Sequence, residues 1–201
     1  MKLIGNGAEA KVYFDKGSVI KRRIEKGYRI PEIDKKLRIR RTRKEAKILE
    51  KLGNTCPDVI EVTDHEITMS YLEGPMVKDV VDDLVKSKSS KLFNSLGNNV
   101  AKMHLLNIVH GDLTTSNMMV VDEKVKLIDF GLSFVTDKIE HKAVDLHLFK
   151  QALESKHYLH FERYFESFLK GYKLNNSLYS EVMERLESVE KRGRYKRKLG
   201  A

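Results

Sequence analysis

The chain has 201 residues, of which 41% are hydrophobic and 33% are charged, and its formal net charge is +9. This length suffices for one domain, or two small lobes, with a core that needs no disulfide or metal. The longest apolar run covers residues 118–121, which excludes a transmembrane helix, and the first residues lack the apolar run of a signal peptide. A single cysteine, Cys56, excludes a disulfide framework. We therefore expect a cytoplasmic protein that does not bind membranes.

The positive charge is concentrated in two segments. Residues 21–51 hold 14 Lys or Arg against 5 Asp or Glu, and residues 191–201 hold 6 basic residues and no acid. Two basic segments on an otherwise acidic body suggest an anionic partner, for which RNA is the obvious candidate. A solvated helix face explains the first segment equally well. For residues 191–201 we favour a binding role, because such a dense cluster of like charges repels itself unless a partner neutralises it.

The first 72 residues have the pattern of a small sheet with one helix. Four short segments read as strands: residues 11–14, 18–21, 59–62 and 67–71. Asp15, Lys16 and Gly17 form a hairpin turn between the first two of these strands. Residues 41–52 show the apolar spacing of a helix, which the glycine at position 53 should end.

Beyond residue 73 the pattern becomes mostly helical. One buried helix stripe is predicted from apolar spacing at Leu92, Phe93, Leu96, Val100 and Met103. A hairpin is predicted from residues 118–121 and 125–128, and the chain becomes helical again after Ala143. An aromatic stripe indicates core packing at Tyr158, Phe161, Tyr164, Phe165, Phe168, Leu169 and Tyr172. We interpret His157 and His160, three residues apart, as ordinary helical residues and not as a metal pair.

The strongest chemical signal is the run His-Gly-Asp-Leu-Thr-Thr-Ser-Asn at residues 110–117, followed by Asp-Phe-Gly at residues 129–131. Phosphoryl transfer needs a carboxylate that can accept a hydroxyl proton. It also needs a second carboxylate and an amide oxygen to hold Mg²⁺ against the phosphates. Asp112, Asp129 and Asn117 supply these groups in the order that kinase-like enzymes use.

The N-terminal part supplies further elements of a phosphate site. Residues 5–12 form a glycine-rich loop between two strands, and glycines let a backbone approach phosphates closely. Lys21 ends a strand at a position that suits phosphate oxygens, and Glu45 on the following helix can hold this lysine. The signals from Lys21 and Glu45 are each weak alone, but their position before the Asp112 motif strengthens both.

Together these motifs resemble the protein-kinase fold over nearly the whole chain. The expected fold class is α+β, a minimal bilobal kinase-like fold. It has a small N-terminal β-sheet lobe with one helix (residues 1–72), a mostly helical C-terminal lobe (residues 73–190) and a basic tail (residues 191–201). Five segments narrow the resemblance to the small atypical kinase subunit of the KEOPS complex, in its archaeal form: residues 5–10, 41–46, 110–117, 142–146 and 192–194.

This resemblance implies ATP and Mg²⁺ as cofactors, with ATPase activity and atypical Ser/Thr kinase activity. It implies a role in threonylcarbamoyladenosine modification of tRNA. The implied partners are the threonylcarbamoyl-transferase subunit, a small regulatory subunit and tRNA.

The resemblance also implies a role for each matching residue. Asp112 becomes the catalytic base or the water-orienting residue, and Lys21 becomes the phosphate-binding lysine held by Glu45. The implied Mg²⁺ ligands are Asn117 and Asp129. The remaining implied residues are the ATP-binding Ile4, Gly5, Gly7, Ala8 and Val12, the adenine-pocket Met69, Ser70 and Leu72, of which the last two bind adenine through their backbone, and Asp145, which anchors the catalytic-loop backbone. The residues expected to contact tRNA or a partner are Arg192, Arg194, Lys196, Arg197 and Lys198.

Three departures from ordinary protein kinases are informative. The third loop glycine is Ala10, and the loop tip carries Glu9, whose charge is unfavourable near phosphates unless a cation bridges it. Gly111 replaces the arginine that usually precedes the catalytic aspartate. Only 13 residues, 132–144, separate the Asp-Phe-Gly motif from Asp145, and no proline follows Pro75, so no Ala-Pro-Glu motif exists. ATP hydrolysis or transfer to a positioned partner therefore fits better than broad peptide phosphorylation.

Two other hypotheses compete with this one. The His-Gly-Asp run also resembles the aminoglycoside and choline phosphotransferases, which act on small molecules. The basic C-terminal segment is compatible with a non-catalytic tRNA-binding scaffold that uses a kinase fold.

Overall fold

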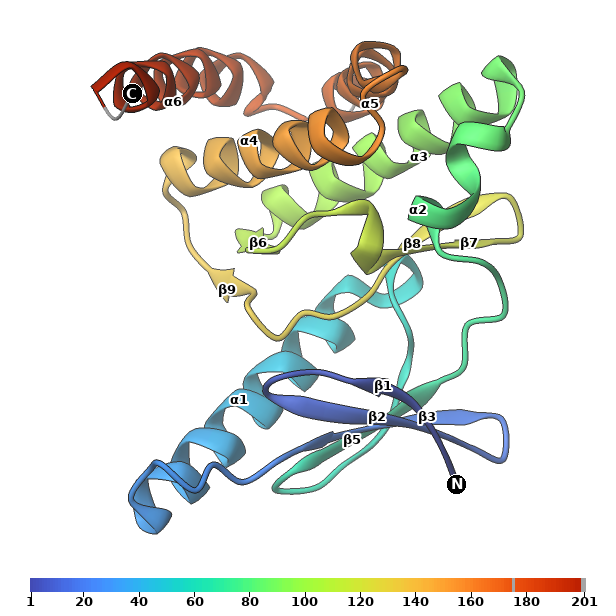
Figure 1. Ribbon diagram of the computed structural model, residues 1–201, viewed down its shortest axis with the longest axis vertical. Coiled ribbons are helices and arrows are strands. Elements are labelled where there is room, and N and C mark those ends of the chain that lie inside the picture. Colours follow the sequence, from blue (N-terminus) through green and yellow to red (C-terminus); the bar gives the residue numbers. More distant parts are fainter. Residues whose placement is uncertain (175, 200–201) are drawn as a thin grey trace. The chain divides into compact units, whose positions relative to one another are not determined.

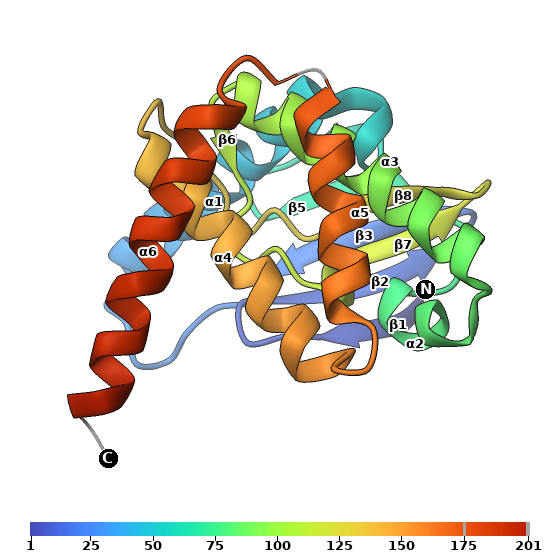
Figure 2. The same cartoon turned by 90° about the horizontal axis from the view of Figure 1, so that it is seen from above.

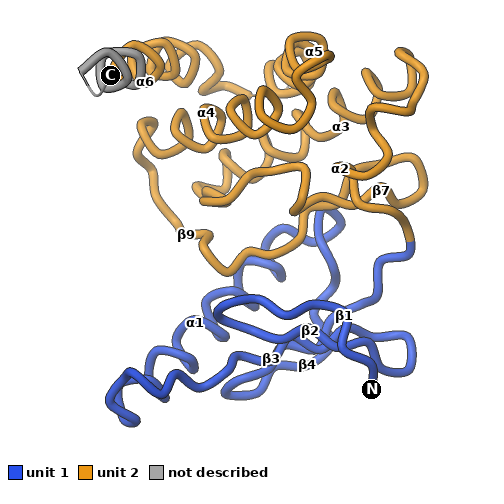
Figure 3. Tube along the Cα trace, in the orientation of Figure 1, with its two compact units in different colours: residues 1–73 blue, residues 74–201 orange. Residues whose placement is uncertain are grey.

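The computed structural model describes residues 1–174 and 176–199, with side chains described as far as residue 192. Two compact units make up the chain, Met1–Glu73 and Gly74–Ala201 (Figure 3). The first unit ends at Glu73, whereas the sequence placed the boundary after Leu72. No helix among the described residues is long and apolar enough to cross a membrane.

The first unit is built on a five-stranded sheet in which every neighbouring pair is antiparallel (Figure 1). Its strands are β1 (Lys2–Asn6), β2 (Ala10–Asp15), β3 (Ser18–Arg23), β4 (Val59–Val62) and β5 (Glu66–Ser70), in the order β1-β2-β3-β5-β4. The four predicted strand segments are therefore confirmed. Lys16 and Gly17 join β2 to β3 with φ angles of 46° and 82°. Positive φ at both central residues gives the hairpin turn whose twist matches that of the strands.

Helix α1 (Pro31–Leu52) packs against β4 and β5 and buries Ala46, Ile48 and Leu49. The prediction that this helix starts at residue 41 was wrong by ten residues. The start signals are a proline in the first turn and the acidic residues Glu32 and Asp34, which suit the positive end of the helix dipole. Residues 31–40 hold three apolar residues, Ile33, Leu37 and Ile39, among a majority of charged ones, and none of the three is buried. The prediction therefore relied on the denser apolar pattern of the later turns. The stop at Gly53 is confirmed, with φ at 50°.

The second unit is mostly helical (Figure 2). Its helices are α2 (Val77–Val80), α3 (Lys86–Leu105), α4 (Ile139–Lys156), α5 (Phe161–Leu174) and α6 (Tyr179–Leu199). Helix α3 packs on α5, and α4 packs on both α5 and α6. A Cβ atom on Gly97 would lie 2.0 Å from the carbonyl oxygen of Phe168, and one on Gly171 would lie 1.8 Å from that of Asn94. These two glycines therefore allow α3 and α5 to cross at very short range.

Two small antiparallel sheets flank the two segments of the predicted phosphoryl-transfer motif, residues 110–117 and 129–131. They consist of β6 (Ile108–Val109) with β9 (Phe134–Val135), and β7 (Met118–Val121) with β8 (Lys124–Leu127). The second pair is the predicted hairpin. Residues 110–117 lie between β6 and β7, and residues 128–133 lie between β8 and β9. The pairing of these strands thus brings the two halves of the motif to the same part of the second unit.

Most of the predicted core is confirmed. The stripe on α3 is buried along its length, as are Tyr164, Phe168 and Tyr172 on α5. The inclusion of Tyr158 was wrong, because this residue precedes α5 and is 68% exposed. The interpretation of His157 as an ordinary helical residue was also wrong, because it follows the end of α4 and its side chain is buried. His160 likewise lies before the first residue of α5.

Candidate active site

Asp112 and Asn117 are held together at the two ends of a short loop. The amide nitrogen of Asn117, Nδ2, donates one hydrogen bond to Oδ2 of Asp112 (2.8 Å) and another to its main-chain oxygen (2.9 Å). A 3₁₀ turn at Thr115–Asn117, in which the N–H of Asn117 donates to the carbonyl of Thr114 (2.9 Å), shapes the loop between them. Because Nδ2 makes both bonds, they do not use Oδ1, the amide oxygen that can bind a metal.

Asp145 holds the start of this loop from helix α4. Its carboxylate accepts the N–H of His110 at Oδ2 and the N–H of Gly111 at Oδ1, both at 2.9 Å. His104 lies 3.2 Å from Oδ2 and donates to it, since a carboxylate only accepts. Burial alone would raise the pKa of Asp145, but the hydrogen bonds from the ring of His104 and from the N–H of His110 lower it. The buried carboxylate therefore stays ionised and fixes the loop backbone.

Gly111 stands where most kinases have arginine, and the backbone explains why. Its φ is +79°, a conformation that side chains disfavour. A Cβ atom there would lie 2.8 Å from the carbonyl oxygen of Leu132, which is a backbone atom that cannot move aside cheaply. An arginine at this position would therefore strain the loop and collide with the segment that follows Asp-Phe-Gly.

His110 links the loop to the segment that carries Asp129. Its Nε2 donates to the carbonyl of Ile128 (3.2 Å), while Nδ1 accepts the N–H of Asp112 (3.3 Å), so the ring is neutral with its proton on Nε2. Burial lowers the pKa of His110, and the opposing charge of Asp145 does not overcome this. The N–H of Ile128 also donates to the carbonyl of Asn117 (3.0 Å). Asp112, Asn117 and Asp129 therefore share one small region of the second unit.

Asp129 itself is exposed and sits at a positive φ of 60°. Its Oδ1 accepts the N–H of Gly131 (3.2 Å). A non-glycine residue at such a φ costs about 1–3 kcal/mol, and strain of this kind gathers at functional sites.

A second set of contacts supports the loop of residues 110–117, and no pattern in the sequence indicated it. The ring of His157 lies between Thr115, inside the loop, and Asp82, whose Oδ2 is 2.7 Å from Nδ1 of the histidine. Tyr164 donates to the main-chain oxygen of Val81 (3.0 Å) at the same place. These contacts join segments that are between 42 and 83 residues apart in the chain, so no local pattern could reveal them.

In the first unit, Lys21 and Glu45 form a short ion pair. Nζ of Lys21 lies 2.5 Å from Oε1 of Glu45, whose side chain is only 3% exposed. The other oxygen, Oε2, binds Nη2 of Arg23, also at 2.5 Å. Sequence reasoning missed Arg23, although alternation along β3 puts residues 21 and 23 on the same face of the strand.

The remaining residues expected at a nucleotide lie on β1, β2 and β5. The glycine loop turns between β1 and β2, where the N–H of Gly7 donates to the carbonyl of Ala10 (3.0 Å). Ile4 and Ala8 are exposed and Val12 is half-buried, while Met69 is buried on β5. The N–H of Ser70 donates to the carbonyl of Asp58 (2.9 Å), so this residue could offer a ligand its carbonyl but not its N–H. Leu72 is half-buried just beyond the end of β5.

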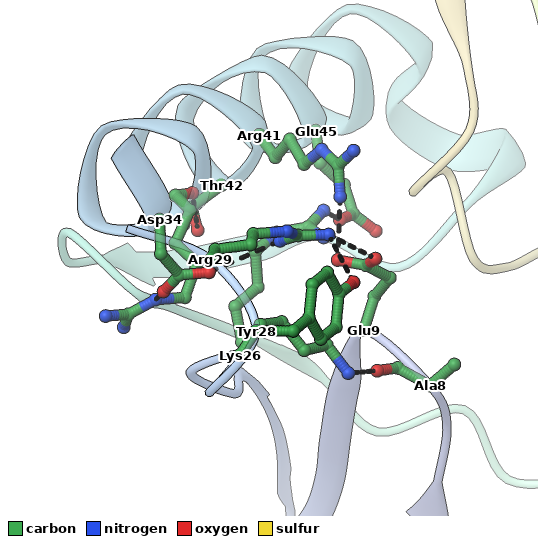
Figure 4. A network of polar contacts seen from close by, with 11 residues as sticks. Ala8, Glu9, Lys26, Tyr28, Arg29, Asp34, Arg41, Thr42 and Glu45 are labelled. Carbon is green, nitrogen blue, oxygen red and sulfur yellow. Dashed lines mark hydrogen bonds and ion pairs between the residues drawn. The ribbon is translucent and has the colours of Figure 1, made fainter. Parts of the chain in front are cut away.

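The acidic tip of the glycine loop is bridged by cations (Figure 4). Oε1 of Glu9 lies 3.1 Å from Nη2 of Arg29, and Oε2 lies 2.6 Å from Nη1 of Arg41. Burial alone would raise the pKa of Glu9, but the hydrogen bonds and charges of the two arginines lower it. The carboxylate is therefore ionised and neutralised from two sides.

The donor atoms fit a magnesium ion that arrives with a nucleotide. In the part of the chain that the structure describes, no three His, Cys, Asp or Glu side chains group closely enough to hold a metal by themselves. Asn117 and Asp129 offer one amide oxygen and one carboxylate. Mg²⁺ prefers such hard oxygen ligands and commonly completes its shell with water and substrate phosphates.

The basic C-terminal segment continues α6 in its backbone as far as Leu199. Arg192 contacts Glu140 at 2.5 Å, which links α6 to the first turn of α4. The side chains of Arg194, Lys196, Arg197 and Lys198 lie outside the described residues, as do all atoms of residues 200–201.

Comparison with known proteins agrees with this geometry. A family model described as the RIO domain matches residues 11–151, which makes the chain a RIO-domain protein of the protein-kinase-like class. It is 45% identical to the KEOPS complex subunit Bud32 of Pyrococcus abyssi, with 98% of this chain and 97% of the relative covered. It is 37% identical to a probable serine/threonine-protein kinase BUD32 homolog of Archaeoglobus fulgidus, with 94% of each covered. The chain therefore belongs to the Bud32 family, and the resemblance drawn from the motifs is confirmed.

A third relative has a different architecture. The chain is 40% identical to a probable bifunctional tRNA threonylcarbamoyladenosine biosynthesis protein of Methanococcus maripaludis, over 96% of this chain but only 36% of the relative. The chain thus spans about a third of the bifunctional relatives and nearly the full length of the other two.

Proposed function

We propose that this protein is an ATP-dependent phosphotransferase and ATPase of the atypical Ser/Thr kinase type. We propose further that it acts as a KEOPS subunit in threonylcarbamoyladenosine modification of tRNA. The chemical part rests on residues 110–117 and 129–131, and the biological part on the printed names of the Bud32 and bifunctional relatives. The proposed partners are the threonylcarbamoyl-transferase subunit, a small regulatory subunit and tRNA.

In this proposal each residue has one task. Asp112 orients a hydroxyl group, from a Ser or Thr side chain or from water, and accepts its proton as the oxygen attacks the γ-phosphate. The bond between the γ-phosphorus and the β–γ bridging oxygen breaks in the same step, and ADP leaves. Lys21 binds phosphate oxygens, and Glu45 keeps its ammonium group extended. Asn117 and Asp129 hold Mg²⁺, which when bound neutralises charge on the phosphates.

The observation that carries the proposal is the pair of hydrogen bonds from Asn117 to Asp112. A carboxylate that serves as base must be held in one orientation before the substrate arrives. The side-chain amide of Asn117 orients the Asp112 carboxylate through its nitrogen, while its oxygen remains suited to bind a metal. If the two residues only capped a turn, the side-chain bond to the Asp112 carboxylate would not be needed.

The short segment after Asp-Phe-Gly limits the substrates that we propose. Strand β9 occupies Phe134–Val135, and α4 already begins at Ile139. This leaves few residues for an extended surface on which a peptide could dock. We therefore propose that the phosphate goes to water or to a group positioned by a partner.

The test compares two aspartates that share a backbone conformation and exposure. Asp129 and Asp122 are both exposed and have φ angles of 60° and 48°. Asparagine tolerates positive φ, so neither Asp129→Asn nor Asp122→Asn should disturb the backbone. We expect Asp129→Asn to lower Mg²⁺-dependent ATP turnover by roughly 10²–10³-fold, and Asp122→Asn to leave it unchanged. Equal turnover by both variants, with unchanged melting temperatures, would refute the assigned site.

A further inference from the structure

The tip of the glycine loop is tied down by more than its own turn. The main-chain oxygen of Glu9 accepts the N–H of Ile24 (3.3 Å), and Lys26 donates to the carbonyl of Ala8. The carboxylate of Glu9 adds the two arginine contacts already described. The loop tip is therefore bonded through backbone and side chain to residues 24–41 of the same unit.

The contacts of Glu9 continue into helix α1 (Figure 4). Arg29 uses Nη2 for Glu9 and Nη1 for Asp34, at 3.1 Å and 3.3 Å. Asp34 is only 1% exposed and also binds Nε of Arg38 at 2.6 Å. Arg29 thus bridges the loop tip to a buried carboxylate in the first turn of α1, while Arg41 binds the tip directly from two turns further along the helix.

The same helix carries the partner of Lys21. Arg41 and Glu45 are four residues apart on α1, a spacing that places two side chains on neighbouring positions of one helix face. Arg41 binds the loop tip and Glu45 binds Lys21 and Arg23. The glycine-loop tip and Lys21, which are both expected to contact phosphates, are therefore each bound to a side chain of helix α1.

We propose that Glu9 is a positioning residue, which Arg29 and Arg41 hold so that the glycine loop is fixed to α1 before the nucleotide binds. This inference rests on the proposed nucleotide-binding role of the loop. An unpaired carboxylate at the tip would repel phosphates, but here it is paired with two guanidinium groups. Glu9 can therefore order the loop while the two arginines neutralise its negative charge.

Release of the loop tip should affect ATP binding and the chemical step differently. A loop that is already ordered loses less conformational entropy when a ligand binds. Releasing the loop should therefore weaken ATP binding and raise its KM, while kcat changes little because Asp112, Asn117 and Asp129 are untouched. A residue that acted in the chemical step would instead lower kcat.

The test uses Glu9→Gln, which keeps the size of the side chain and removes its charge. We expect the backbone amides of residues 7–10 to exchange with deuterium roughly three- to thirty-fold faster in the nucleotide-free protein, and KM for ATP to rise by a similar factor. Adding Arg41→Gln to Glu9→Gln should change neither quantity further, because both variants remove the same contact. The matched control is Arg43→Gln on the same helix, whose pair with Asp64 is 64% and 53% exposed and does not involve the loop.

Two results would overturn the inference. Unchanged exchange in Glu9→Gln would mean that the ion pairs do not order the loop. A lower KM would mean that the charge of Glu9 repels ATP and that the arginines do not offset it. Hydrogen exchange is measured without nucleotide, so it tests the loop contacts even if the parent protein turns over no ATP. Absence of turnover would instead contradict the proposed function.

Discussion

Nε2 of His157 lies 2.9 Å from the hydroxyl oxygen of Thr115, and both side chains are buried. Nδ1 of the same ring lies 2.7 Å from the carboxylate of Asp82, which can only accept, so Nδ1 carries a proton and donates it to Asp82. This chain of contacts reaches the loop of residues 110–117 midway between Asp112 and Asn117. The loop is thus held at its start by Asp145 and in its middle by His157.

Removing this ring should therefore loosen the loop and destabilise the fold. His157→Ala leaves the buried hydroxyl of Thr115 without this hydrogen-bond partner, which we expect to cost about 1–3 kcal/mol of unfolding free energy. Denaturant unfolding measures the loss, and His160→Ala is the control, since the ring of His160 contacts Tyr164 and not the loop. A double-mutant cycle with Thr115→Val should give a coupling energy of about 0.5–3 kcal/mol. Strict additivity would show that the two side chains do not interact.

Glu45 should matter for folding and Lys21 for activity. Glu45→Gln removes the carboxylate from Arg23, whose side chain is 4% exposed, and breaking a buried pair in this way costs about 3–5 kcal/mol. Lys21→Met keeps the pair between Glu45 and Arg23, so we expect less than about 1 kcal/mol of destabilisation. ATP turnover of Lys21→Met should nevertheless fall by roughly 10²–10³-fold. Thermal unfolding and turnover assays of both variants separate the two effects, and a Lys21→Met variant with parental turnover would contradict the role of the lysine.

Gly171 should be needed for the packing of α3 on α5. Alanine normally favours a helix by about 1 kcal/mol over glycine. Here its Cβ would overlap the carbonyl oxygen of Asn94, so Gly171→Ala should destabilise the protein by about 1–3 kcal/mol or more. Gly27→Ala is the control, because no atom lies within 4 Å of its Cβ position. A neutral Gly171→Ala would mean that the two helices can separate without cost.

Stability should fall when the pH drops below the ordinary histidine pKa of about 6.5. Burial lowers the pKa of His110 in the folded protein, so the unfolded chain binds a proton more readily in this range. The contribution of His110 is fully present above pH 6.5 or so and is lost as the pH falls toward the lowered value, with a slope of at most about 1.4 kcal/mol per pH unit. Protonation would also put a hydrogen on Nδ1, where the N–H of Asp112 now donates.

Unfolding free energies measured from pH 7.5 to 5 test this expectation. His110→Asn has no group that titrates in this range and should show a smaller slope than the parent. The same slope in both proteins would mean that another group is responsible.

The basic segment at the C-terminus should contact RNA phosphates. Replacing Arg194, Lys196, Arg197 and Lys198 by glutamine should weaken tRNA binding and reduce its dependence on salt, because each phosphate contact adds about 0.7–0.9 to the slope of log K against log salt. A control with the same change in charge replaces four exposed cations of α1, namely Lys35, Lys36, Arg40 and Lys47. A larger loss of tRNA affinity in the control would mean that residues 21–51, and not the C-terminal segment, make the main RNA contacts.

The strands, the stripe on α3 and the short loop that joins Asp112 to Asn117 could be predicted because each is a local pattern. Alternation, helical spacing and the distance from Asp112 to Asn117 depend on residues that are neighbours in the chain. The start of α1 was missed because charged residues outnumber the few apolar ones in its first turns, and none of those apolar residues is buried. The burial of His157 was missed because its partners are remote in the chain. The contact of Arg23 with Glu45 could have been predicted, since Arg23 lies on the same face of β3 as Lys21.

The sequence by itself determined which chemical groups are present and the order in which they follow one another. Only the tertiary structure decided which of them meet: Glu9 with Arg29 and Arg41, Arg23 with Glu45, and His157 with Thr115. A hydrogen bond or ion pair depends on distances of a few ångströms. Residues dozens of positions apart reach such distances only after strands have paired and helices have packed, and no local pattern records that outcome.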